Sequence, residues 1–103
     1  MKTHKPRYTD LTVASLYHFA TMGDLKFKRS SLKSICKEQN ILGTILLATE
    51  GVNGTITGKY DCIQIILDAI RGWQEISDLE VKYSTSTQEN FNRMKVRIKD
   101  EIV

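Results

Sequence analysis

Long apolar runs are missing from this 103-residue chain. No stretch approaches the roughly 20 apolar residues that a membrane-spanning helix needs. The basic start of the chain is not followed by the apolar segment of a secretory signal, so we expect a cytoplasmic protein without membrane contact. The sequence has one proline and no low-complexity tract or linker, and its length suits a single hydrophobic core.

Cysteine and histidine are too few and too scattered to indicate a metal or redox site. Cys36 and Cys62 lack the Cys-x-x-Cys spacing of zinc and disulfide-exchange motifs, and each falls in an apolar helical pattern. We therefore expect two reduced, buried thiols, and neither histidine has a partner at ligand spacing. The residues predict no catalytic group, no metal site and no cofactor in this chain.

The charge of the chain is mildly basic, with a formal net charge of +3. Such a charge permits contact with nucleic acid but does not require it. Residues 1–11 are expected to form a mobile basic arm, and residues 12–103 a single domain.

Hydrophobic periodicity predicts two helices and five strands. Strands are expected at 12–20, 43–49, 55–57, 79–83 and 93–99, and helices at 25–39 and 60–71. The order β-α-β-β-α-β plus one strand predicts an α/β (α+β) ferredoxin-like sandwich of the acylphosphatase type. Its two helices would cover one face of a mostly antiparallel sheet. The first and third strands would be central and parallel, and the fifth would lie at an edge.

The ends and faces of the helices also have sequence signals. Asp24 is placed to cap the first helix, and Asn40 or Gly43 to end it. Gly72 should end the second helix. The predicted core stripe of that second helix is Ile63, Ile66, Leu67 and Ile70.

The last strand alternates cations with apolar residues from Arg93 to Lys99. Successive side chains of a strand point to opposite faces, so the cations form one row. The members of this row are Arg93, Lys95, Arg97 and Lys99. The row suits an anionic partner, but cations on an edge strand also deter aggregation between sheet edges, and both interpretations are open.

Two other segments offer candidate sites. Tyr17 and Phe19 share one face of the first strand and could stack on RNA bases, although ordinary packing explains them too. The predicted third strand offers only residues 55–57 as a second shelf, so an RNA-binding platform is half present. Acylphosphatase chemistry is disfavoured, because the loop at residues 20–25 has no arginine to hold a phosphate.

The segment from Glu50 to Gly54 is predicted to be the turn that joins the second and third strands. Glu50 and Asn53 could form a polar site there. Turn chemistry explains Gly51, Asn53 and Gly54 equally well.

Together, three segments resemble one protein family: Leu16–Phe19, Gly43–Gly54 and Arg93–Val103. The chain resembles the N-terminal domain of the rhodanese-containing tRNA hydroxylases (the TrhO family). The resemblance implies oxygen-dependent hydroxylation of carbon 5 of the wobble uridine in bacterial tRNAs. It also implies that the catalytic cysteine lies in a following rhodanese domain, which this chain lacks, so we expect the chain to be inactive alone.

The resemblance leaves two roles open. In the first, the domain helps to hold tRNA, with the cation row on phosphates and Tyr17 or Phe19 on an unpaired base. In the second, it is a structural module that packs on the rhodanese domain in cis or in trans. Its sheet face would then be exposed in isolation and could support a dimer.

Overall fold

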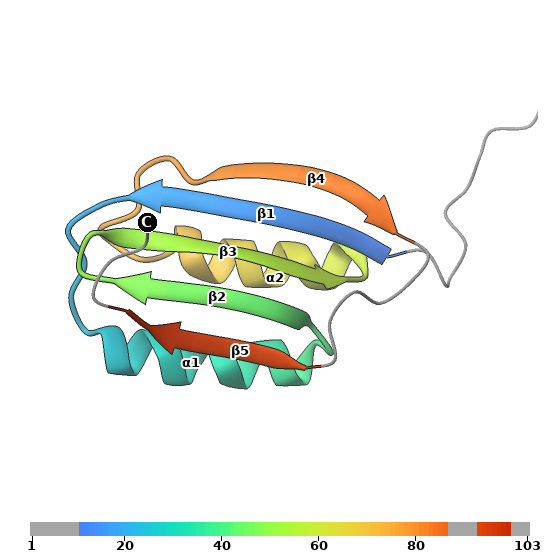
Figure 1. Ribbon diagram of the computed structural model, residues 1–103, viewed down its shortest axis with the longest axis horizontal. Helices are drawn as coiled ribbons and strands as arrows, with labels where there is room; N and C mark the ends of the chain where they lie inside the picture. Colours follow the sequence, from blue (N-terminus) through green and yellow to red (C-terminus); the bar gives the residue numbers. More distant parts are fainter. Residues whose placement is uncertain (1–10, 87–92, 100–103) are drawn as a thin grey trace, which may run out of the picture.

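The computed structural model describes residues 11–86 and 93–99. The predicted basic arm lies outside this range except for its last residue, and so do residues 87–92 and 100–103. Seven elements follow in the predicted order (Figure 1). They are β1 (Leu11–Phe19), α1 (Leu25–Glu38), β2 (Leu42–Ala48), β3 (Gly51–Gly58), α2 (Tyr60–Arg71), β4 (Glu80–Ser86) and β5 (Met94–Ile98).

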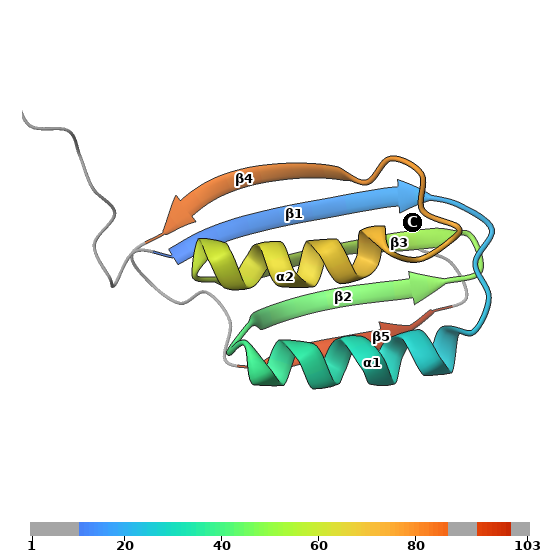
Figure 2. The same ribbon diagram turned by 180° about the vertical axis from the view of Figure 1, so that it is seen from behind.

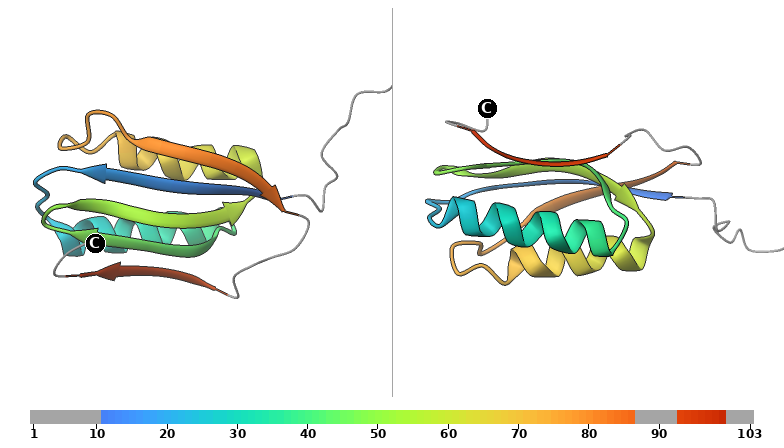
Figure 3. Two further views of the ribbon diagram at one scale, coloured as in Figure 1. Left: turned by 45° about the horizontal axis from the view of Figure 1, so that its top comes forward. Right: turned by 90° about the horizontal axis from the view of Figure 1, so that it is seen from below.

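The five strands form one sheet in the order β4-β1-β3-β2-β5. Both helices cover the same face of it, as Figure 2 and the edge-on view in Figure 3 show. The ferredoxin-like sandwich with an extra edge strand is therefore confirmed. None of the helices among the described residues is long and apolar enough to cross a membrane.

The predicted parallel pairing of the two central strands is wrong. β1 and β3 are adjacent but antiparallel, and the only parallel pair in the described sheet joins β2 to β5. The right-handed crossover through α1 makes β2 parallel to β1 while leaving a gap between them. The hairpin then turns the chain back, so the strand that fills the gap runs the opposite way.

The predicted buried face of α2 is confirmed. The predicted α2 stripe, Ile63, Ile66, Leu67 and Ile70, is fully buried against the sheet. Burial of each such side chain contributes about 1.5–3 kcal/mol relative to exposure. The sheet meets the helices with Ala14, Leu16, Ile45, Leu47, Val52, Ile56 and Val96. This alternation leaves every second residue of each strand on the other, uncovered face.

The predicted C-terminal end of α1 is confirmed, and the predicted cap at its N-terminal end is wrong. Asn40 ends the helix in the left-handed conformation (φ 55°), and Ile41 N–H donates to Cys36 O at 2.9 Å, as in a Schellman motif. Asp24 stands at the N-terminus, but its side chain makes no capping hydrogen bond. Its backbone is left-handed (φ 52°), outside the extended conformation that an Asp cap requires.

Candidate nucleic-acid interface

The face of the sheet opposite the helices, here called the open face, carries the predicted RNA-binding residues together. Strand register aligns its side chains in rows that cross all five strands. One row is Lys82, Ser15, Thr55, Thr44 and Lys95, and the next is Glu80, Tyr17, Asn53, Leu46 and Arg97. The open face therefore has a polar centre, an aromatic strand and a cationic edge.

The aromatic part of the open face is a pair along β1. Tyr17 and Phe19 are 41% and 56% exposed, and their rings meet edge to face with centroids 5.1 Å apart. Asn53 lies beside Tyr17 in the neighbouring strand, and Gly51 lies beside Phe19. Because Gly51 has no side chain, Phe19 is uncovered on that side, and the pair forms a small accessible shelf.

Residues 55–57 of β3 provide no second aromatic shelf, as the sequence indicated. Ile56 points to the helices and is fully buried, and Thr57 is 1% exposed. Asn53 is the β3 residue beside Tyr17, and it was predicted to be part of the turn. The stacking surface is thus one strand wide, with an amide rather than a second ring beside it.

The strand that alternates cations with apolar residues is β5, at the edge of the sheet. Val96 is buried under α1, which confirms the apolar row, although Ile98 is 38% exposed. Lys95 and Arg97 pair in register with the open-face residues Thr44 and Leu46. Arg93 and Lys99 continue the alternation at the two ends of β5, where their backbones still bond to β2. Lys95 and Arg97 therefore belong to the open face, and Arg93 and Lys99 flank them just beyond the two ends of β5.

The cations of β5 have no carboxylate partner among residues 11–86 and 93–99. The ion pairs in that part of the chain lie elsewhere, between Lys28 and Glu75 and between Arg71 and Asp68. From strand spacing, the β5 row lies about 14 Å from the aromatic shelf, three strand intervals across the sheet. An anion approaching β5 would therefore meet positive charge that no carboxylate of the described residues neutralises.

The residues of the polar site predicted at the hairpin lie in different elements. The turn is only Thr49 and Glu50, and Gly51 to Gly54 belong to β3. Glu50 lies in the turn, where its backbone oxygen accepts Ala20 N–H at 3.0 Å. Asn53 is on the open face and Gly54 faces the helices, so alternation separates residues that the turn prediction grouped.

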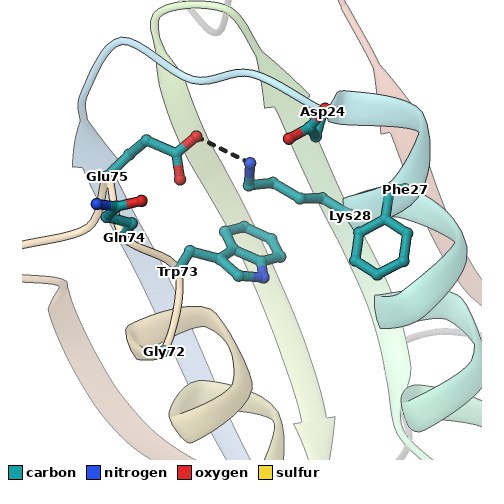
Figure 4. Close-up of a pocket in the computed structure, with 7 residues that line it drawn as sticks. All are labelled: Asp24, Phe27, Lys28, Gly72, Trp73, Gln74 and Glu75. Carbon is teal, nitrogen blue, oxygen red and sulfur yellow. Dashed lines mark hydrogen bonds and ion pairs between the residues drawn. The ribbon is translucent and has the colours of Figure 1, made fainter.

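A cluster that the sequence prediction missed lies on the helix side, around a pocket of about 540 Å³ (Figure 4). Lys28 is 5% exposed. Its ammonium contacts the Glu75 carboxylate at 2.9 Å, lies 5.4 Å from the Trp73 ring centre, and donates to Gly23 O. The sequence contains one signal that could have revealed this cluster. Lys28 is a lone cation four residues before Leu32, on the apolar stripe of α1.

Glu75 ties the two helices to the loop between β1 and α1. Its carboxylate accepts Gly23 N–H at 3.1 Å as well as the Lys28 contact. These bonds, first that from Gly23 and then that from Lys28, lower the pKa of Glu75 from 4.5 to about 2. We call Gly23, Lys28, Trp73 and Glu75 the helix-side clasp. Its role is structural, because the charges of Lys28 and Glu75 are already paired with each other.

The two thiols differ in burial. Cys36 is fully buried, and burial raises the pKa of its thiol to about 12. Cys62 is only half-buried, which differs from the burial predicted for it. The described residues contain no cluster of His, Cys, Asp and Glu that could hold a metal ion.

A family model described as a UPF0176 acylphosphatase like domain matches residues 11–102. The chain belongs to this family. The match covers the first two segments on which the resemblance was based and all but the last residue of the third, and the predicted membership is confirmed.

Curated relatives of this acylphosphatase-like domain are longer proteins. A tRNA uridine(34) hydroxylase of Mesorhizobium japonicum is 44% identical over 91 residues, which are 88% of this chain and 29% of the relative. One from Teredinibacter turnerae is 39% identical over 95 residues, 92% of this chain and 30% of the relative. The chain therefore spans about 30% of the length of these relatives and corresponds to their N-terminal part.

Solved structures share the fold at low identity. An acylphosphatase from Bacillus subtilis superposes with a TM-score of 0.63 at 16% identity, over 84% of this chain and 97% of that chain. The BlrP1 BLUF structure superposes with a TM-score of 0.72 at 15% identity, over 91% and 66%. These likenesses concern the fold alone.

The loop between β1 and α1 of this acylphosphatase-like domain is not arranged to hold an anion. Ala20 and Met22 donate their N–H groups to the hairpin carbonyls of Glu50 and Thr49, at 3.0 and 2.8 Å. Gly23 donates to the Glu75 carboxylate. Because these loop amides are already bonded within the chain, they cannot cradle a phosphate, in agreement with the missing arginine.

Proposed function

We propose that this chain is the tRNA-holding accessory domain of a tRNA uridine(34) hydroxylase. In this proposal the cations of β5 contact phosphates, and Tyr17 or Phe19 stacks on an unpaired base. The observation that carries the proposal is the register that puts both groups on one open face. Phosphate contacts would position the tRNA, and stacking would favour an unpaired loop such as the anticodon.

The hydroxylation itself would take place elsewhere in the full-length protein. The Cys36 thiol is fully buried, and the resemblance assigns catalysis to a following rhodanese domain. This chain would act in the cytoplasm, without a cofactor of its own, and would be inactive alone. Its partners would be tRNA and the rest of the hydroxylase in cis.

A tRNA titration with a four-cation variant tests this proposal. The variant replaces Arg93, Lys95, Arg97 and Lys99 by Gln and lowers the formal net charge from +3 to −1. Loss of four phosphate contacts should reduce the slope of log affinity against log salt by about 3 to 4. The fold should persist, because none of the four makes a side-chain hydrogen bond or ion pair within the described residues.

A second variant controls for total charge. Lys26, Lys37, Lys59 and Arg71 are exposed on or beside the helices, away from the open face. Their replacement by Gln gives the same net charge of −1 and should leave most of the salt dependence in place. Equal losses in both variants would mean that only the net charge matters, and would contradict the proposed contact surface.

The alternative is that the open face packs on the rest of the hydroxylase. The exposure of Phe19, at 56%, favours a covering partner of some kind. The cation row, which has no carboxylate partner among the described residues, favours RNA as that partner. Packing between domains predicts instead that the chain binds no tRNA and self-associates, and that both Tyr17→Ala and Phe19→Ala weaken the association.

A further inference from the structure

The outer edge of β5 and the side of α1 enclose a groove that the sequence prediction did not include. The pocket has a volume of about 320 Å³. It is lined by Arg29 and Lys33 of α1 and by residues 93–97, and we call it the edge groove. Figure 2 shows α1 over β5 at one margin of the sheet and β4 at the opposite margin, and α1 and β5 are in contact.

The lining of the edge groove is strongly cationic. Among the described residues that line it, the cations are Arg29, Lys33, Arg93, Lys95 and Arg97, and the others are Met94 and Val96. None of these described lining residues is acidic, and within the described parts of the chain none of the cations pairs with a carboxylate. Like charges gathered without counter-ions repel one another, so a bound anion would stabilise this arrangement.

Arg29 is held in place before any ligand binds. Its Nε–H donates to Val96 O on the outer edge of β5 at 2.9 Å. This bond satisfies a carbonyl that an edge strand would otherwise expose, so Arg29 already protects the edge from pairing. The terminal amino groups of the guanidinium make no other hydrogen bond within the described residues and remain able to bind phosphate oxygens in a bidentate manner.

We infer that the edge groove binds phosphate groups of an RNA backbone that crosses the open face and turns over β5 toward α1. The inference rests on the proposed RNA-binding function and extends its contact surface to two residues of α1. Lys95 and Arg97 belong both to the open face and to the groove, so the two surfaces are continuous. Arg29 and Lys33 would then contact the phosphates that follow those on the open face.

The test compares Arg29→Gln/Lys33→Gln with Lys59→Gln/Arg71→Gln, which removes the same charge from the other helix. Each of the two lost phosphate contacts lowers the salt slope by about 0.7 to 0.9. Wild type should therefore lose about tenfold more tRNA affinity than Arg29→Gln/Lys33→Gln between 50 and 200 mM salt. The α2 variant should follow wild type. Lys33→Gln alone, which breaks no described contact, should give half of the slope change.

The outcomes separate this inference from the proposed function. If Arg29→Gln/Lys33→Gln follows wild type while the four-cation variant loses its salt dependence, the groove inference is wrong and the open face still binds tRNA. If wild type binds no tRNA, both fail. A second measurement follows the thermal unfolding temperature of wild type and Arg29→Gln/Lys33→Gln with and without inorganic phosphate. Stabilisation by phosphate that requires Arg29 and Lys33, with tRNA affinity unchanged, would mark a site for free phosphate and overturn the inference.

Discussion

Replacement of Gly43 by alanine should severely destabilise the sheet. Gly43 is in β2 with φ 132°, a conformation that residues with a side chain rarely adopt. A Cβ atom there would lie 2.2 Å from Thr55 O and 2.8 Å from Ile56 Cα. The unfavourable backbone conformation costs about 1–3 kcal/mol and the steric overlap about 1–3 kcal/mol more.

The expected loss of about 2–6 kcal/mol is large against the total stability of about 5–15 kcal/mol of a small domain. It should lower Tm by at least about 8 °C. Urea unfolding followed by circular dichroism measures the loss directly. Gly23→Ala is the matched control, because a Cβ atom at Gly23 meets nothing within 4 Å and the backbone is not strained. It should change stability by less than about 1 kcal/mol.

The consequence for function is indirect. Gly43 pairs with Ile56 of β3 and with Met94 of β5, so it helps to fix the register that aligns the open face. A Gly43→Ala variant as stable as Gly23→Ala would refute the close approach of β2 and β3 at this point. Such a result would also weaken the evidence for the row alignment on which the proposed RNA contact surface is based.

Two further predictions concern the open face and the helix-side clasp. Tyr17→Ala/Phe19→Ala should weaken tRNA binding by about 1–3 kcal/mol for each base that stacks. The unfolding transition should change little, because both rings are exposed. Unchanged tRNA affinity would show that neither ring stacks on a base. The pKa of Glu75 is lowered in the folded state, so its contribution to stability is present above pH 4.5 and disappears as the pH falls toward about 2. Denaturation of wild type and Glu75→Gln should therefore differ at pH 7 and converge near pH 2, whereas a constant difference would contradict the clasp of Glu75 with Gly23 and Lys28.

Local periodicity was sufficient to predict the elements that have one clear apolar face. The α2 stripe from Ile63 to Ile70 has helical spacing, and Arg93 to Lys99 alternates, so each pattern determines both the element and its buried side. The open face follows from this alternation, although its residues come together only once the strand order is known.

The errors come from features that depend on tertiary contacts. Gly51 and Gly54 suggested a long turn, but the close approach of β2 requires glycine inside β3, where a Cβ atom at Gly54 would lie 2.5 Å from Thr44 O. From the sequence alone, Lys28 would be taken for a surface lysine. Its burial depends on Glu75 and Trp73, which are far away in sequence but lie beside it in the structure. Arg29 likewise gains its role only from Val96 O on the last strand.

If the open face binds tRNA through the β5 cations, salt should weaken binding by wild type far more than binding by the four-cation variant. The affinity of this chain for tRNA at 50 and 200 mM salt, measured beside the four-cation variant and its charge-matched helix control, tests this. Wild type and the helix control should lose about a hundredfold more affinity with salt than the four-cation variant. Equal salt dependence in all three proteins, or no binding by wild type at low salt, would contradict it.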